Sequence, residues 1–214
     1  MRWQGAIFDL DGTLLDSMEI WDQLGVRYLR GRGVAPRPEL ETVLMTATMT
    51  QAAEYFIKTY HFPETAEEIV DGINALLAAF YSQEVKAKPG VEAFLQSLRA
   101  DGTALCVATA TDRPQVEAGL AHAGLAPYFS RIFTCTEVGA GKERPDVFEA
   151  ALAYLGTEKS RTLVVEDALH AVETAKRAGF PVACVLDASS RPVWETIKAR
   201  SDYLLDDPKG LVKL

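Results

Sequence analysis

The sequence predicts an α/β fold in which a mainly parallel sheet is covered by helices on both faces and a small all-helical domain interrupts the chain after the first strand. Two observations predict it. From about residue 88 onward, short apolar runs alternate with amphipathic helical patterns, as in β-α-β units. Residues 17–84 break this alternation, because helical patterns follow one another there without a strand-like run.

The alternating part of the chain supplies the expected sheet. Its first strand is the apolar run 6–10, which ends just before Gly12. Helices are expected between the later strands, because apolar residues recur there at helical spacing and Gly or Pro marks the helix ends. The later strands are expected at residues 104–109, 132–135, 162–165, 182–186 and 203–205, and the helices within residues 90–102, 112–124, 145–156 and 167–179.

The helical stretch is expected to form a cap domain of residues 17–84, inserted into a catalytic core made of residues 1–16 and 85–214. Apolar side chains share helix faces in three segments of the cap, which include Tyr28, Phe56 and Ile73. The sequence therefore predicts a small helical bundle beside an open sheet.

Composition narrows the classes of function. The chain has 214 residues, a net charge of −8 and a pI near 5.0, which disfavours nucleic acid and anionic membrane surfaces as partners. It lacks an apolar stretch long enough to span a bilayer, and we expect no signal peptide, because residues 1–5 lead directly into the first apolar run. The three cysteines, Cys106, Cys135 and Cys184, lie in apolar runs and are expected to be buried, reduced thiols. We therefore expect a cytoplasmic protein. Both a monomer and a dimer agree with the sequence.

The end of the first strand carries the strongest chemical signal. Asp9 and Asp11 are one residue apart, so a strand would point both carboxylates to the same side. Two close negative charges are unfavourable unless a cation or a proton lies between them. The pair predicts a metal site, a nucleophile with its acid/base partner, or both.

Three further strand ends carry polar residues: Thr109, Lys142 after a glycine-containing turn, and the pair Glu166 and Asp167. Each of these residues, taken alone, could have a purely structural role. Thr often caps turns, Lys is usually exposed to solvent, and acidic residues often stabilise helix N-termini. Together they offer acids for a divalent cation, one positive side chain, one hydroxyl and backbone N–H groups. Such a set suits a phosphoryl group.

These same segments carry a family resemblance. Residues 8–17 (FDLDGTLLDS) resemble the first motif of the haloacid dehalogenase superfamily, and residues 107–109, 141–148 and 164–167 resemble its second, third and fourth motifs. The inserted helical segment is similar to the cap of the phosphoglycolate phosphatase and β-phosphoglucomutase subgroup. The resemblance implies a Rossmann-like core and a phosphatase that acts on a small phosphorylated metabolite.

The resemblance also implies roles for the acids. Asp9 would attack phosphorus and form an aspartyl-phosphate, while Asp11 would protonate the leaving oxygen and then activate water. Mg²⁺ would be held by Asp9, the backbone carbonyl of Asp11 and Asp167, with Glu166 close by.

The phosphoryl oxygens would be held, by the same resemblance, by Thr109, the backbone N–H of Ala110 and Lys142. The cap would close over the substrate and read its leaving group. The expected specificity residues in the cap are Trp21, Asp22, Thr46, Thr48 and Met49. For Trp21 the alternative is a place in the core of the helical bundle.

The chain departs from the pattern of its relatives at three positions. Glu143 stands where relatives often have Pro, and Ala168 and Ala171 stand where they often have Ser and Gly. The loss of the hydroxyl at Ala168 is expected to alter the support of the metal ligands without abolishing activity.

Three alternative functions remain open from the sequence. A phosphomutase of the β-phosphoglucomutase type is disfavoured, because Trp21 stands near the position of its cap histidine and residues 45–50 contain no arginine. A signalling module of the receiver type is disfavoured by the Asp-Leu-Asp-Gly-Thr string at residues 9–13 and by the inserted helical segment. A non-catalytic protein that only binds a phosphorylated ligand is disfavoured because Asp9, Asp11, Lys142 and Asp167 are all present.

Overall fold

The computed structural model describes residues 3–44, 47–206 and 210–214. It contains two compact units, one made of residues 1–18 and 85–214 and the other of residues 19–84. The expected specificity residue Thr46 lies outside the described residues. No helix within the described part is both long and apolar enough to cross a bilayer.

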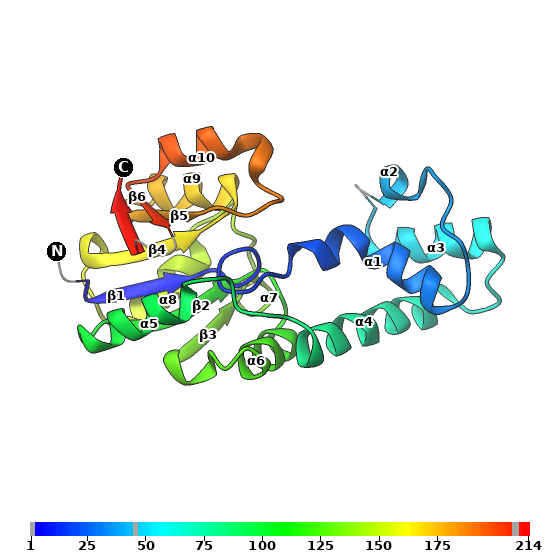
Figure 1. Cartoon of the computed structure of the whole chain (residues 1–214), viewed down its shortest axis with the longest axis horizontal. Coiled ribbons are helices and arrows are strands. Elements are labelled where there is room, and N and C mark those ends of the chain that lie inside the picture. The colour runs from blue at the N-terminus through cyan, green and yellow to red at the C-terminus, as the bar shows by residue number, and fades with distance from the viewer. Residues whose placement is uncertain (1–2, 45–46, 207–209) are drawn as a thin grey trace. The chain divides into compact units, whose positions relative to one another are not determined.

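The larger unit is built on one seven-stranded sheet with the strand order β3-β2-β1-β4-β5-β6-β7 (Figure 1). The first six strands are parallel and only β7 runs antiparallel, against β6. The predicted α/β fold is therefore confirmed. The strands are β1 (Gly5–Phe8), β2 (Ala104–Thr109), β3 (Arg131–Thr134), β4 (Thr162–Glu166), β5 (Val182–Val185), β6 (Tyr203–Asp206) and β7 (Gly210–Lys213).

The strand order indicates where a ligand site is expected, because successive strands are added first on one side of β1 and then on the other. β1 pairs with β2 on one side and with β4 on the other. In an open parallel sheet, ligands bind beyond the carboxyl ends of the strands at such a reversal. The ends of β1, β2 and β4 are thus brought together.

The helices of the larger unit are α5 (Val91–Ala100), α6 (Arg113–His122), α7 (Cys135–Val138), α8 (Asp146–Leu155), α9 (Leu169–Arg177) and α10 (Trp194–Arg200). The four helices that the sequence predicts are α5, α6, α8 and α9. The single turn of α7 corrects the expected strand end at Cys135. Thr134 caps this turn, because its hydroxyl accepts from the Glu137 N–H at 3.2 Å and the Glu137 side chain returns to the Thr134 N–H.

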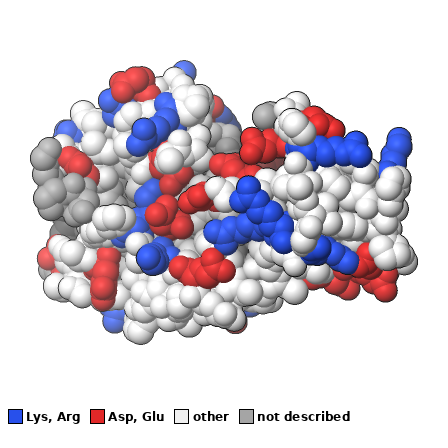
Figure 2. Space-filling view, turned by 45° about the vertical axis from the view of Figure 1, so that its right-hand side comes forward, with Lys and Arg blue, Asp and Glu red and all other residues white. Residues whose placement is uncertain are grey.

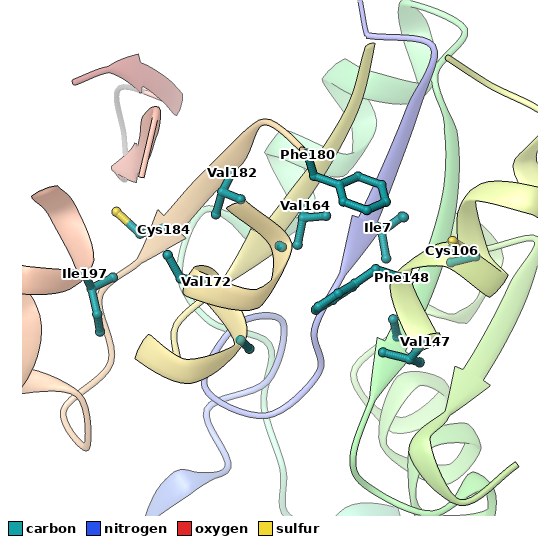
Figure 3. Close-up of a cluster of buried hydrophobic side chains, with 14 residues drawn as sticks. Ile7, Cys106, Val147, Phe148, Val164, Val172, Phe180, Val182, Cys184 and Ile197 are labelled. Carbon is teal, nitrogen blue, oxygen red and sulfur yellow. The ribbon is translucent and has the colours of Figure 1, made fainter. Parts of the chain in front are cut away.

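One cluster of buried apolar side chains joins the sheet to α8 and α9 (Figure 3). Ile7 and Val164 enter it from the central strands, Phe148 from α8 and Val172 from α9, all fully buried. Burial of this kind is the main stabilising term for such a fold. The two strands that lead to the acidic residues, β1 and β4, are therefore buried along their whole length.

All three cysteines are free thiols, as expected, but they are not equally buried. Cys106 and Cys184 are buried, and burial raises the pKa of the Cys106 thiol to about 12. Cys135 is only half-buried, because it begins α7 instead of ending a strand. This corrects the expectation that all three thiols are buried.

The smaller unit contains α1 (Met18–Gly31), α2 (Leu40–Leu44), α3 (Met49–Tyr60) and α4 (Ala66–Gln83). Capping boxes at Thr48 and Thr65 begin α3 and α4. The rings of Tyr28 and Phe56 stack in its interior, with their centroids 5.7 Å apart. The short helix α2 is not evident in the sequence pattern, because only Leu40 of its residues is buried.

Candidate active site

The register of the central strands brings the acids together. Phe8, the last residue of β1, lies beside Val165 of β4, and the Asp9 N–H donates to the Val165 carbonyl at 3.0 Å. Glu166 ends β4 and Asp167 follows it. Ligand atoms of the Asp9, Glu166 and Asp167 carboxylates all lie within 4.8 Å of one another, and all three residues are buried.

The turn after β1 holds the first motif against the fourth. The N–H groups of Leu14 and Leu15 both donate to the Leu10 carbonyl at 2.9 Å, which closes the turn around Gly12. The Thr13 hydroxyl donates to the Asp167 carboxylate at 3.0 Å. Thr13 was not among the expected site residues, although it lies within the first motif.

Gly12 is required by both its backbone and its surroundings. Its φ is 80°, and a Cβ at this position would lie 2.5 Å from the Asp167 carboxylate oxygen. We expect Gly12→Ala to displace Asp167 and lower kcat by about 100-fold, because small misplacements of catalytic groups have effects of this size. Gly33→Ala is the matched control, since Gly33 has a φ of 73° and no atom within 4 Å of the added Cβ.

Gly33→Ala should lower the free energy of unfolding by about 1 kcal/mol, because alanine disfavours the left-handed backbone conformation, and it should keep the wild-type kcat. Steady-state turnover and urea unfolding of both variants separate the two effects. An equal loss of kcat in both variants would contradict the proposed contact with Asp167.

Lys142 is buried and lies between two of the carboxylates. Its Nζ donates to Asp9 Oδ1 and, at 2.5 Å, to Glu166 Oε1, and only 6% of its side chain is exposed. Burial by itself lowers the pKa of Lys142, but the Asp9 and Glu166 carboxylates more than offset this, so the pKa lies above its ordinary value. Lys142 is thus a fixed positive charge, not the exposed loop lysine of the alternative interpretation.

One lysine does not balance three buried acids. Burial raises the pKa of Asp9 well above its ordinary value, and the neighbouring carboxylates add to this while Lys142 opposes it. Burial and the Glu166 carboxylate also raise the pKa of Asp167 to about 7. A buried group of hard oxygen ligands with excess negative charge fits a divalent cation such as Mg²⁺.

Glu166 is held from several sides. Its Oε1 accepts from Lys142, and its Oε2 accepts from the N–H groups of Asp167 at 3.1 Å and Ala168 at 3.2 Å. The departure to alanine at 168 leaves this backbone contact in place. Glu166 therefore orients Lys142 and the turn after β4, in addition to its place in the acidic cluster.

Asp11 is held by two hydroxyls. Ser17 donates to Asp11 Oδ1 at 2.6 Å, and Thr111 donates to Asp11 Oδ2 at 2.5 Å. The Thr111 N–H in turn donates to the buried Thr109 hydroxyl at 3.1 Å. The Thr109 hydroxyl therefore stabilises the turn after β2, which is the structural role that the sequence also allows for it. Ala110, the next residue, is exposed. Thr111 was not among the expected site residues. It lies two residues after Thr109, so its position at the end of the same strand could have indicated it.

A second ion pair, also unexpected, joins the part-buried Lys88 to the buried Asp187. Lys88 donates to Asp187 Oδ2 at 2.6 Å and to the backbone carbonyls of Gly12 at 2.8 Å and Leu186 at 2.9 Å. Burial by itself raises the pKa of Asp187, but hydrogen bonds from Lys88 and Ser189 more than offset this, so the pKa lies below its ordinary value. Lys88 thus ties the first-motif turn to the loop after β5.

We expect Lys88→Met to destabilise the protein by about 3 kcal/mol at neutral pH, because it leaves a buried carboxylate without its partner. Lys86→Met is the control, since Lys86 is exposed and lies two residues away. Urea unfolding measures both. Because the pKa of Asp187 is lowered in the folded state, the stabilisation should be present above the unfolded pKa of about 3.9 and be lost as the pH falls below it. Equal unfolding midpoints for the two variants would contradict this.

The expected cap residues form a group within the smaller unit. Trp21, Asp22, Thr48 and Met49 line one cavity there. Trp21 is 37% exposed, so its alternative placement in the bundle core is wrong. Thr48 also caps α3, with its hydroxyl accepting from the Gln51 N–H at 3.2 Å.

Comparison with known proteins identifies the family. The model of the haloacid dehalogenase-like hydrolases matches residues 6–185. The chain belongs to this family. The match confirms the resemblance that the four motifs indicate, and it spans the acidic cluster, Lys142 and the inserted helices.

Two curated relatives are phosphatases. The chain is 29% identical to a phosphoglycolate phosphatase of Rhodobacter capsulatus, over 82% of this chain and 80% of that protein. It is 27% identical to the bifunctional riboflavin kinase/FMN phosphatase of Arabidopsis thaliana, over 84% of this chain but 48% of that protein, so it spans about half of that relative's length. Among solved structures, a Thermotoga maritima protein assigned as a β-phosphoglucomutase has the same fold, with a TM-score of 0.81 and 22% identity over 95% of this chain and 94% of that one.

Proposed function

We propose that this haloacid dehalogenase-like hydrolase is a magnesium-dependent phosphatase that hydrolyses a small phosphorylated metabolite through an aspartyl-phosphate. The observation that carries the proposal is the buried cluster of Asp9, Glu166 and Asp167, with Lys142 donating into it and Asp11 held nearby by two hydroxyls. The phosphatases among its relatives support the same reaction class.

The first step is transfer of the phosphoryl group to Asp9. Lys142 takes one carboxylate oxygen of Asp9, which leaves the other to attack phosphorus. The new bond joins Asp9 to phosphorus as the bond to the ester oxygen breaks. Asp11 gives its proton to that departing oxygen, so the product leaves as a neutral alcohol.

The second step is hydrolysis of the aspartyl-phosphate. Asp11, now a carboxylate, accepts a proton from water as the water oxygen attacks phosphorus. The bond between phosphorus and Asp9 breaks, inorganic phosphate leaves and the Asp9 carboxylate is restored. The Ser17 and Thr111 hydroxyls keep Asp11 in place through both steps.

Magnesium would be held by Asp9, Asp167 and the backbone carbonyl of Asp11, with Glu166 beside them. When bound, the ion neutralises the crowded carboxylates and polarises the phosphoryl oxygens. Lys142 adds positive charge on the side of Glu166. We propose that Thr109 and the N–H of Ala110 contact the phosphoryl group at the end of β2.

The decisive test is phosphate release from a broad panel of phosphorylated metabolites, with Mg²⁺ and with a chelator. We expect release from a small number of monoesters that stops when the metal is removed. Interconversion of a hexose phosphate without release of phosphate would instead identify a phosphomutase. A folded protein that acts on no compound of the panel would favour a non-catalytic role in binding a phosphorylated ligand.

A further inference from the structure

We propose that the ion pair between Lys88 and Asp187 positions the metal ligands of the acidic site. The pair fixes the backbone at Gly12, which sets the Asp11 carbonyl and the Asp167 carboxylate. The inference rests on the proposed function and extends it, because it adds two residues outside the four sequence motifs to those that shape metal binding. All of the residues involved belong to the larger unit.

The ammonium group of Lys88 joins two loops at one point. It has three N–H donors, and it donates to the Gly12 carbonyl at 2.8 Å, the Leu186 carbonyl at 2.9 Å and Asp187 Oδ2 at 2.6 Å. Gly12 lies in the turn after β1, whereas Leu186 and Asp187 follow β5. Lys88 therefore holds the first-motif turn against a loop at the same edge of the sheet.

Both members of the pair are anchored independently of Gly12. Asp187 Oδ1 accepts from the Ser189 N–H at 2.9 Å and from the Ser189 hydroxyl at 2.7 Å. The backbone N–H of Lys88 donates to the Leu14 carbonyl at 2.9 Å. The Lys88 ammonium is therefore held at a fixed place, and the Gly12 carbonyl is held to it.

The pair is also shielded from solvent. Acidic and basic side chains lie interspersed on the face in Figure 2, where water and salt screen their charges. Lys88 and Asp187 differ from such surface charges, because only 11% and 4% of their side chains are exposed. Weak screening and three short hydrogen bonds make this pair suitable as a fixed support.

Gly12 is held through both of its backbone groups. Its N–H donates to the Leu15 carbonyl at 2.9 Å, and its carbonyl accepts from Lys88. The Gly12 N–H shares a planar peptide group with the Asp11 carbonyl, so the directions of the two are set together. The contacts on either side of Gly12 therefore determine where the Asp11 carbonyl points.

The next peptide group leads from Gly12 to Asp167. The carbonyl that Lys88 holds belongs to the peptide between Gly12 and Thr13, and the Thr13 hydroxyl donates to Asp167 Oδ1 at 3.0 Å. A Cβ on Gly12 would lie 2.5 Å from Asp167 Oδ2, so the glycine itself lies against that carboxylate. A displacement of Gly12 would therefore disturb the carboxylate as well as the carbonyl.

The alternative is that the pair only stabilises the fold. A single substitution does not separate the two roles, because it leaves one charge without its partner beside the site. Replacing both partners by neutral side chains of similar size keeps the balance of charge and removes only the support of Gly12. The affinity of the folded double variant for a metal ion then reports on position.

The test titrates Mn²⁺ into the metal-free protein and follows the electron paramagnetic resonance signal of free Mn²⁺. We expect Lys88→Met/Asp187→Asn to raise the Kd by about 10- to 100-fold and to keep an unfolding midpoint in urea near that of wild type. Lys176→Met/Asp202→Asn is the matched control. It removes an ion pair of 2.6 Å at the other end of β5, where Asp202 accepts from the Val182 N–H, and should keep the Kd within about twofold.

Failure of this inference is distinguishable from failure of the proposed function. A wild-type Kd in the folded double variant would overturn the inference and leave the phosphatase proposal standing. A wild-type protein that binds no Mn²⁺ would overturn both the inference and the proposed metal dependence. Because the readout is binding, a lack of hydrolysis in the phosphate-release panel would count against the phosphatase proposal alone.

A second variant decides the matter if circular dichroism shows the double variant to be unfolded. Lys88→Arg keeps the positive charge and a partner for Asp187, but its longer, planar head group does not place one nitrogen where three acceptors converge. A Kd for Mn²⁺ about tenfold above that of wild type would support the inference. An unchanged Kd in folded Lys88→Arg would overturn it.

Discussion

Asp9→Asn is expected to lower kcat by roughly 10⁴- to 10⁶-fold, the range seen when a catalytic nucleophile is removed. The substitution keeps the size of the side chain and a carbonyl oxygen that can still accept from Lys142. It removes the carboxylate that attacks phosphorus, so no aspartyl-phosphate can form. Phosphate release under saturating substrate measures the effect.

The matched control for Asp9→Asn is Asp16→Asn, the same change in an exposed side chain of the same segment. We expect it to keep kcat within about twofold, since surface changes away from a site are usually nearly neutral. Trapping of phosphate on the protein in wild type, and its absence in Asp9→Asn, gives a second readout. Wild-type turnover in Asp9→Asn would exclude Asp9 as the nucleophile.

The strands that lead to Asp9 and Glu166 could be predicted from the sequence, because each has a local signal. The apolar run before Asp9 and the run before Glu166 are short, buried and bounded by turn residues, and both are strands at the centre of the sheet. In a parallel sheet their ends must meet, so the closeness of the acids follows from topology. The burial of Lys142 does not follow, since a loop lysine is normally exposed.

Two of the contacts that support the acids join residues far apart in the sequence. Thr111 reaches Asp11 across 100 positions of sequence, and Lys88 reaches Asp187 across 99. Neither pair has a helical or strand spacing that could reveal it. The edge strand β7 was missed for a related reason, because its four residues are only half-buried or exposed and its pairing with β6 alone defines it.

Lys142→Met is expected to affect both stability and activity, because Lys142 is the cation between two buried acids. The change leaves Asp9 and Glu166 without their partner, and breaking a buried ion pair in this way costs about 3–5 kcal/mol. We expect the loss, measured by urea unfolding in chelator, to be smaller near about pH 5 than near about pH 8. Burial raises the pKa of Asp9 in the folded protein, so Asp9 takes up a proton at a higher pH than in the unfolded chain, where the pKa of an aspartate is about 4. At the lower pH the loss of Lys142 therefore leaves less uncompensated negative charge.

Activity should fall further than the folded population accounts for, since Lys142→Met also removes the positive charge beside Asp9 during phosphoryl transfer. Lys198→Met is the control, because Lys198 pairs at 2.8 Å with a largely exposed Glu195 and such surface pairs contribute about 0–1 kcal/mol. A Lys142→Met protein as stable as this control at both pH values would contradict the assignment of Lys142 as the cation that stabilises the buried acids. If Lys142→Met is destabilised in chelator and regains stability when Mg²⁺ is added, a bound cation can replace the positive charge of Lys142 beside the buried acids.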